Sequence, residues 1–262
     1  MELKFDSINY KDYLNNISLN FSNNKIMGIY GDNSNYILDI INGDIIDYEG
    51  NIVVDNIILD KNFYKKNSSF IALIDSKYFF YTNNVEEEFK FNLAFRKKDI
   101  PNIDKKICEL LTLVGFESNI LKRDISSLSS SEKYLLSVAI NLIYEPKIIL
   151  FKDVFFGLDR NNKKKMMMVI KNLKEENKIL IVTNKDTNIL YELVDEVILL
   201  DNSSVYKIGA CDKIFTSNDL MKEKVIPMPY ITRITYLAKS KKVKLTYHKD
   251  VRDIIKDIYK HV

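Results

Sequence analysis

Three short apolar runs alternate with helical segments in the second half of the chain, and this alternation constrains the fold more than any other feature. The runs are KIILFKD (147–153), KILIVTN (178–184) and EVILLD (196–201), and the segments between them have the apolar spacing of amphipathic helices. Strands as apolar as these are buried on both faces, which is the arrangement of a parallel sheet with helical crossovers. The sequence therefore predicts an α/β fold with a mostly parallel sheet core.

The remaining segments predict three further units around that core. Residues 2–9 and 17–22 alternate apolar and polar side chains, as half-buried antiparallel strands do. Leu and Ile recur at helical spacing through a region of about 85–145, which we expect to form a helical subdomain. After Gly209 the pattern changes again, so we expect a domain over 1–210 and a small helical C-terminal extension over 211–262.

Composition excludes several classes of function. The 262 residues carry 39 Lys and Arg against 36 Asp and Glu, and no basic block is long enough to track a nucleic acid. Two cysteines exclude a disulfide framework and a four-thiolate zinc site, and we expect no bound metal. The N-terminus lacks a signal-type apolar region, and no stretch reaches the ~18 apolar residues of a membrane span. We therefore expect a cytoplasmic protein, peripheral to the cell membrane through a partner.

Two long segments resemble an ABC-transporter ATPase subunit in their order and spacing. GIYGDNSNYILDIINGDIIDYEGNI (28–52) stands where that family has its phosphate loop (Walker A) and the following helix. LSSSEKYLLSVAINLIYEPKIILFKDVFFGLDR (128–160) stands at the signature loop, the Walker B strand and the D-loop. The resemblance implies the P-loop NTPase-like ABC ATPase fold, with a mostly parallel sheet core, an antiparallel β subdomain and a helical subdomain.

Shorter strings narrow the resemblance to the energy-coupling factor (ECF) group, whose members import vitamins and metal ions. These strings are Asn42–Gly43, NNVEEEFKFN (83–92) and the tail IPMPYITRITYLAKSKKVKL (226–245). The tail is similar to the C-terminal extension of that group's ATPase subunits.

The phosphate-loop position lacks the residues that bind phosphates. Such a loop uses glycine N–H groups, a lysine and a helix N-terminus, but none of the seven glycines here is followed by Lys. The remnant Gly31, Asp32, Asn33 and Ser34 is about three residues shorter than the family's loop. Asp32 also opposes an anion, so we expect this remnant not to hold a triphosphate.

The other catalytic positions are replaced as well. Lys152 and Asp153 stand where the resemblance places the magnesium-positioning Asp and the catalytic Glu. A lysine ~4 Å from a divalent cation costs roughly 8 kcal/mol at an effective dielectric of 20. We expect Asp153 to be the partner of Lys152 inside an empty site. Asn184 replaces the switch histidine, and because the chain has no Gln, Asp75 or Ser76 occupies the Q-loop position.

The signature and D-loop positions keep more of the pattern. Ser129, Ser130, Ser131 and Glu132 follow Leu128 at the signature, where they either face the nucleotide of a partner subunit or form an ordinary serine N-cap with Glu132. The turn Gly157, Leu158 and Asp159 matches the D-loop, which the resemblance places at a dimer interface.

Together these observations predict a degenerate, non-hydrolysing subunit of an ECF-type importer that pairs with a homologous active ATPase subunit and an integral membrane subunit. We expect no cofactor at its own site, with Mg-ATP shared at the partner's composite site. Region 75–95 would transmit closure to the membrane subunit. Two alternatives stay open: an active ATPase with a rearranged phosphate loop, or a scaffold or regulatory protein without a transporter. Tyr10 and Tyr13 are candidates for an adenine-stacking ring.

Overall fold

A six-stranded sheet forms the centre of the computed structural model, which describes residues 1–95, 100–217, 220, 226–241, 243 and 245–261. Its strand order is β10-β9-β3-β8-β7-β6, and every neighbouring pair is parallel except β9 and β10. The strands are β3 (Ile26–Tyr30), β6 (Ile71–Asp75), β7 (Ile148–Lys152), β8 (Ile179–Thr183), β9 (Glu196–Asp201) and β10 (Ser204–Ala210). The three apolar runs are therefore β7, β8 and β9, and the predicted parallel core is confirmed.

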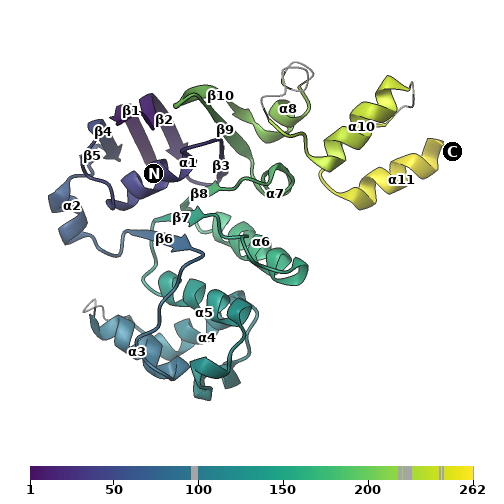
Figure 1. The fold of residues 1–262 in the computed structure, drawn as a ribbon. Helices are drawn as coiled ribbons and strands as arrows, with labels where there is room; N and C mark the ends of the chain where they lie inside the picture. The colour runs from purple at the N-terminus through teal and green to yellow at the C-terminus, as the bar shows by residue number, and fades with distance from the viewer. Residues whose placement is uncertain (96–99, 218–219, 221–225, 242, 244, 262) are drawn as a thin grey trace.

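A second, antiparallel sheet of four strands packs beside the first (Figure 1), in the order β2-β1-β4-β5. Its strands are β1 (Glu2–Tyr10), β2 (Leu14–Ser22), β4 (Glu49–Val54) and β5 (Ile57–Ile58), and the helix α2 (Lys61–Lys66) follows. Helix α1 (Ser34–Asn42) shares one apolar cluster with strands of both sheets. It ends at Gly43, whose left-handed φ of 82° closes the helix, as the Asn42–Gly43 pair predicts.

Helices cover the other face and one end of the parallel sheet. The helical region contains α3 (Val85–Phe95), α4 (Ile103–Leu113) and α5 (Ser130–Leu142), with short 3₁₀ turns at Ser118–Lys122 and Ile125–Ser127. Crossover helices α6 (Arg160–Lys174) and α7 (Thr187–Leu193) connect the parallel strands. The fold class is thus the predicted one, with a parallel core, an antiparallel sheet and a helical region.

Three described helices follow β10: α8 (Cys211–Phe215), α10 (Tyr230–Ser240) and α11 (Val251–His261). The sequence predicts helical segments around 212–224, 230–240 and 250–260, and the last two match α10 and α11. The first begins as α8 but is wrong in length, because α8 ends at Phe215 and residues 216–217 are not helical; residues 218–219 and 221–225 lie outside the described residues. In the described ranges, no helix combines the length and apolarity needed to cross a bilayer.

Candidate functional site

The turn from β3 into α1 carries the phosphate-loop remnant at the carboxyl ends of the parallel strands, where open α/β sheets bind ligands. Gly31 has a φ of 129°, and a Cβ there would lie 2.4 Å from the backbone oxygen of Leu200 on β9. A glycine is therefore required for the close approach of two strands, whether or not a phosphate binds. Asp32 is exposed, and Asn33 enters α1 in the left-handed region with no side-chain cap.

An internal ion pair lies between this helix and the Walker B strand. Lys152, the last residue of β7, places its Nζ 2.6 Å from Oδ1 of Asp39 on α1. The two side chains are only 22% and 16% exposed. The expectation that Asp153 pairs with Lys152 is therefore wrong: the carboxylate that neutralises this ammonium comes from a helix more than a hundred residues earlier.

Asp153 belongs to a second bridge across the same edge of the sheet. Its Oδ2 accepts a hydrogen bond from Nδ2 of Asn35 at 2.7 Å, and Oδ1 of Asn35 accepts one from the Thr183 hydroxyl at 2.6 Å. Asp153 adopts a φ of 48°, which turns it away from the direction of β7. Residues of α1, β7 and β8 are thus tied together at the point where the family resemblance places a bound nucleotide and its metal.

These two bridges provide a test of whether the residues present suit Mg²⁺ and a triphosphate. Magnesium takes carboxylate, water and phosphate oxygens at a near-octahedral site, but the strand end here supplies the ammonium of Lys152. The carboxylates of Asp39 and Asp153 already accept hydrogen bonds from protein groups. This donor set does not match a magnesium-nucleotide site.

A cluster of tyrosine rings occupies the neighbouring surface. The ring of Tyr13 stacks on that of Tyr36 with centroids 4.7 Å apart, and Tyr10 lies 5.4 Å from Tyr36. Partial burial and the two neighbouring tyrosines raise the pKa of Tyr36. Of the two candidates for stacking on adenine, Tyr10 is buried and Tyr13 has one face against Tyr36, a residue of α1 that the sequence did not single out. The face of Tyr13 that could stack on adenine is therefore in contact with the ring of Tyr36.

Asn184 directly follows β8 and Asp75 is the last residue of β6, and each side chain accepts hydrogen bonds within the turn that follows. The side-chain oxygen of Asn184 accepts a hydrogen bond from the N–H of Asp186 at 2.7 Å, at the start of α7. At the end of β6, Oδ1 of Asp75 accepts hydrogen bonds from the Ser76 hydroxyl and the Lys77 N–H. The sequence places these residues at the switch and Q-loop positions, and both side chains are engaged in the turns that follow.

The signature residues form a capping box at the start of α5. The Ser129 hydroxyl accepts the N–H of Glu132 at 3.3 Å, and Oε2 of Glu132 accepts the N–H of Ser129 at 2.8 Å. Hydrogen bonds from the backbone and side chain of Ser129 to its carboxylate lower the pKa of Glu132. The structure thus contains the capping arrangement, in which the first N–H groups of the helix, at Ser130 and Ser131, still lack intrahelical acceptors. A role of this loop toward a partner's nucleotide stays a prediction.

The D-loop forms an open turn before α6. Asp159 caps that helix by accepting the N–H groups of Asn161 and Asn162, and Leu158 is buried beneath the turn. Gly157 has a φ of 74° with free space around it, and Phe156 before it is 81% exposed. This loop therefore presents an aromatic ring at the surface where the resemblance places a dimer interface.

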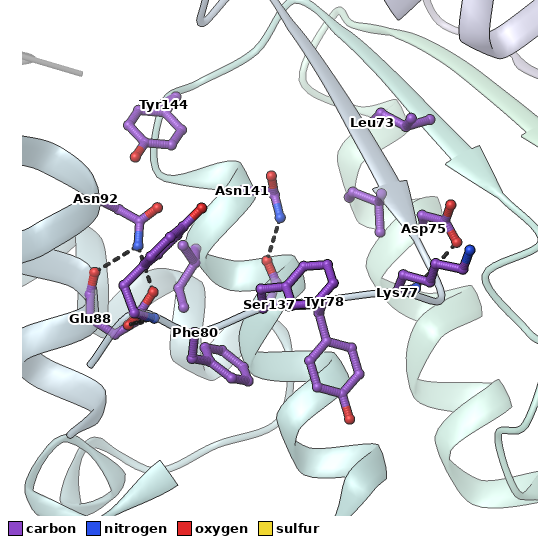
Figure 2. Close-up of a pocket in the computed structure, with 14 residues that line it drawn as sticks. Leu73, Asp75, Lys77, Tyr78, Phe80, Glu88, Asn92, Ser137, Asn141 and Tyr144 are labelled. Atoms are coloured by element: carbon purple, nitrogen blue, oxygen red, sulfur yellow. Dashed lines mark hydrogen bonds between the residues drawn. The ribbon is translucent and has the colours of Figure 1, made fainter. Parts of the chain in front are cut away.

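A cavity of about 250 Å³ lies between the end of β6 and helices α3 and α5 (Figure 2). Tyr78 and Phe80 of the loop after β6 line it together with Asn92 of α3 and Asn141 of α5. Glu88, which is almost fully buried, accepts hydrogen bonds on Oε2 from the N–H groups of residues 81 and 82 and the hydroxyl of residue 82. This carboxylate holds the loop against α3. In the sequence, Glu88 is marked only by its place in an acidic run at the start of a helix.

The sequence analysis did not identify several residues of this site. Asp39 and Asn35 show no motif, although Asp39 is a charged side chain within the apolar helix pattern ILDII, which is a weak signal of a buried partner. Thr183 lies in an apolar run, and Tyr36 is one tyrosine among 16. Their role depends on which strand ends lie beside α1, which the fold alone reveals.

The two sheets, the glycine turn into α1, the capping box before α5 and the capped turn before α6 define an ATP-binding-cassette domain. The family model described as ABC transporter matches residues 14–154, more than half of the chain. The chain belongs to this family.

Individual relatives and structures agree with that assignment. A Pyrococcus furiosus protein, provisionally named an ABC transporter ATP-binding protein, is 29% identical over 246 residues, covering 90% of this chain and 88% of the relative. An energy-coupling factor transporter ATP-binding protein of Mycoplasmoides gallisepticum is 26% identical over 241 residues, covering 84% and 74%. The structure of CbiO1 from Clostridium perfringens, described as part of the ABC transporter complex CbiONQ, matches with a TM-score of 0.73 at 20% identity, covering 89% of this chain and 98% of that one.

Proposed function

We propose that this chain is a non-hydrolysing ATPase-like subunit of an ECF-type importer for a vitamin or metal ion. It pairs with a homologous active ATPase subunit and acts at the cytoplasmic face of the membrane through a transmembrane subunit. The observation that carries the proposal is the partly buried ammonium of Lys152, held by Asp39 where an active subunit needs a magnesium-binding carboxylate.

The charge and shape of the site support the absence of hydrolysis. To bind Mg-ATP, the chain would have to break the Asp39–Lys152 pair and leave an ammonium close to the cation, at a cost of several kcal/mol. It would also have to displace Asn35 from Asp153 and Tyr36 from Tyr13. The shortened loop offers no lysine to offset these losses.

The preserved elements support a partner role. In the family's dimers, each composite site combines the phosphate loop of one chain with the signature of the other, as the resemblance implies. The N-terminus of α5, with Ser129–Glu132 in a capping box, would complete the partner's site and leave this chain's own site inactive. The exposed Phe156 and the turn at Gly157–Asp159 would contribute to the interface.

Coupling to a membrane subunit would use the surface around the cavity in Figure 2. The loop after β6 exposes Phe79 and Tyr81, and the ring of Tyr81 stacks on Phe91 of α3 at a centroid distance of 4.9 Å. An aromatic surface of this kind favours contact with an apolar segment of another protein. This surface lies within region 75–95, where we expect the coupling to occur.

Equilibrium binding of Mg-ATP to the purified chain, measured by calorimetry up to millimolar nucleotide, tests the inactive site. We expect no saturable binding and no ATP turnover. Micromolar binding or measurable turnover would refute the proposal and favour the active ATPase with a rearranged loop. The variant Lys152→Asp separates the two further, because an existing magnesium site would gain turnover and the proposed internal bridge would not.

Co-purification from native membranes tests the complex. A tagged chain is expected to retain an integral membrane protein and a second, intact ATPase. ATP hydrolysis by that assembly should vanish when the partner's catalytic residue is replaced and persist with Lys152→Ala in this chain. Recovery of the chain without any membrane protein would favour the scaffold or regulatory alternative.

A further inference from the structure

A cleft of about 430 Å³ lies between the turn after β8 and the start of the C-terminal hairpin, which consists of α10 and α11. One wall consists of residues 185–188, which connect β8 to α7 and begin that helix, and the other contains Pro227, Met228 and Tyr230. Figure 1 shows α10 beginning beside α7. The volume lies within the range of about 300–1,000 Å³ that is typical of small-molecule sites. This cleft and the cavity of Figure 2 share none of their described lining residues.

The two walls are joined by a continuous series of hydrogen bonds that begins at Asn184. Oδ1 of Asn184 accepts the N–H of Asp186 at 2.7 Å, and Oδ1 of Asp186 accepts the N–H and the side-chain amide of Asn188 at 2.9 and 2.8 Å. Oδ1 of Asn188 in turn accepts the N–H of Tyr230, the first residue of α10, at 2.7 Å. The walls are therefore held in a fixed arrangement, and one of them belongs to the C-terminal extension.

Three polar groups of the first wall have no partner within the part of the chain that the structure describes. The Lys185 ammonium makes no ion pair there, and Oδ2 of Asp186 accepts no hydrogen bond there, because the bonds from Asn188 end on Oδ1. The hydroxyl of Thr187 also makes no hydrogen bond among these residues, although Thr187 is only 3% exposed. A buried hydroxyl is normally hydrogen-bonded, so an acceptor bound in the cleft would satisfy it.

The second wall supplies an apolar surface. Pro227 and Met228 lie just before α10, and the side chain of Tyr230 is 70% exposed. An open aromatic ring favours an aromatic or branched apolar group, because a ring contact is attractive beyond the area that it buries. The cleft thus combines a cationic group, an anionic group and an apolar surface.

We propose that this cleft binds a free α-amino acid with an aromatic or branched apolar side chain, and that the bound molecule fastens the C-terminal extension to the segment after β8. The carboxylate of the amino acid pairs with Lys185 and accepts a hydrogen bond from Thr187, and its ammonium pairs with Asp186. Its side chain lies against Tyr230 and Met228. Because one molecule contacts both walls, binding restrains α10 relative to α7.

The opposite charges of neighbouring residues favour a zwitterion over simpler ligands. A carboxylate alone is attracted by Lys185 and repelled by Asp186, and an amine alone meets the reverse situation. An uncharged aromatic molecule uses only the second wall. A molecule that carries both charges close together matches two charged side chains from adjacent residues.

Binding also acts beyond the cleft. The hydrogen-bond series that ends at the N–H of Tyr230 begins at Asn184, which stands at the switch position. A ligand that contacts Tyr230 and Asp186 holds two members of this series, so the segment after β8 becomes less mobile when the amino acid is bound. This effect needs neither nucleotide nor a partner subunit.

Calorimetric titration of the full-length chain with L-phenylalanine and with L-leucine, each up to about 10 mM, measures the binding. We expect saturable 1:1 binding of at least one of them, with a dissociation constant below about 1 mM. Phenylpropionate and phenethylamine each keep the ring and only one of the two charges. Each should therefore bind at least about tenfold more weakly than L-phenylalanine.

Substitutions in the two walls locate the site. Lys185→Gln, Asp186→Asn and Tyr230→Ala should each raise the dissociation constant at least about tenfold, and Asn is as good an N-cap as Asp, so α7 keeps its cap. Lys164→Gln and Tyr259→Ala are the matched controls, because they remove an exposed lysine and an exposed tyrosine outside the cleft. Both should leave the dissociation constant unchanged. Thermal midpoints verify that each variant is folded.

Hydrogen exchange tests the link between the extension and the segment after β8. At an amino-acid concentration about ten times the dissociation constant, exchange at the start of α7 and in the first turn of α10 should slow by up to about tenfold. Exchange in α3, which is not part of the cleft, should stay the same. Binding without slower exchange in α10 would refute the link.

Three further outcomes would overturn the proposal. The absence of saturable binding of both amino acids would show that the cleft is not a site for them. Equal affinity for N-acetyl-L-phenylalanine amide, which lacks both charges, would reduce the contact to its apolar part. Binding that survives all three wall substitutions would place the site elsewhere. None of these measurements involves nucleotide, so the proposed function can fail without affecting them.

Discussion

The partly buried pair of Lys152 and Asp39 leads to a strong prediction about stability. At a 2.6 Å separation and an effective dielectric of 20, the gross attraction is about 6 kcal/mol, and desolvation of both groups offsets much of it. Lys152→Met leaves the Asp39 carboxylate, 16% exposed, without its cation, so we expect a loss of about 3 kcal/mol. Asp39→Leu should cost a similar amount for the reciprocal reason. The double variant removes both charges and should lie within about 1 kcal/mol of the wild type.

Urea denaturation without nucleotide measures this cycle through the free energy of unfolding. The expected coupling energy is about 5 to 7 kcal/mol, far beyond that of independent sites. The exposed i,i+4 pair of Glu86 and Lys90 provides the control, and Lys90→Met should leave the urea midpoint nearly unchanged. Additive single-variant effects, or a neutral Lys152→Met, would refute the view that this pair replaces a ligand in holding α1 to β7.

Three further predictions concern other parts of the structure. Gly31→Ala should lower the free energy of unfolding by at least about 3 kcal/mol, because the new Cβ would lie 2.4 Å from the backbone oxygen of Leu200. Gly157→Ala, in open space at a φ of 74°, should lower it by only about 1 kcal/mol. Denaturation midpoints of the two variants measure this difference. Glu88→Gln puts an amide where N–H donors need an acceptor, so a loss of about 2 to 3 kcal/mol is expected, and a thermal midpoint equal to that of the wild type would contradict this account. Hydrogen bonds lower the pKa of Asp257 to about 2, so the ordering of the hairpin that they provide is present above pH 4 and lost as the pH falls toward 2; hydrogen exchange in α11 should show this loss in the wild type and not in Asp257→Asn.

Much of the fold was predictable because its strands are short apolar runs with clear ends. KIILFKD is the buried strand β7, and the pattern S-x-x-E before an apolar helix predicts a capping box that the structure contains. Both signals are local: they depend on residues within a few positions of one another. The antiparallel strands and the glycine end of α1 follow from similarly local patterns.

The internal bridges could not be predicted, because they depend on which elements are neighbours in space. Pairing Lys152 with the next residue in the sequence failed for a geometric reason. Successive side chains of a strand point to opposite faces, and Asp153 additionally leaves the strand with a φ of 48°. Asp39 reaches Lys152 because α1 lies across the ends of β7 and β8. For the same reason, Asn35 of α1 reaches Thr183 of β8.

The retained and replaced residues of this site therefore carry different information. Gly31 allows two strands to approach, Asp159 caps a helix, and Ser129 with Glu132 closes another helix, so the fold alone is reason enough to keep them. Residues with such local duties do not discriminate an active ATPase from an inactive one. Lys152 is the residue on which the proposed inactivity rests, because its partly buried ammonium lies at the strand end where a divalent cation would have to bind. Asp39 on α1 neutralises that charge within the protein, so the proposed loss of ATP hydrolysis would be compatible with an intact domain.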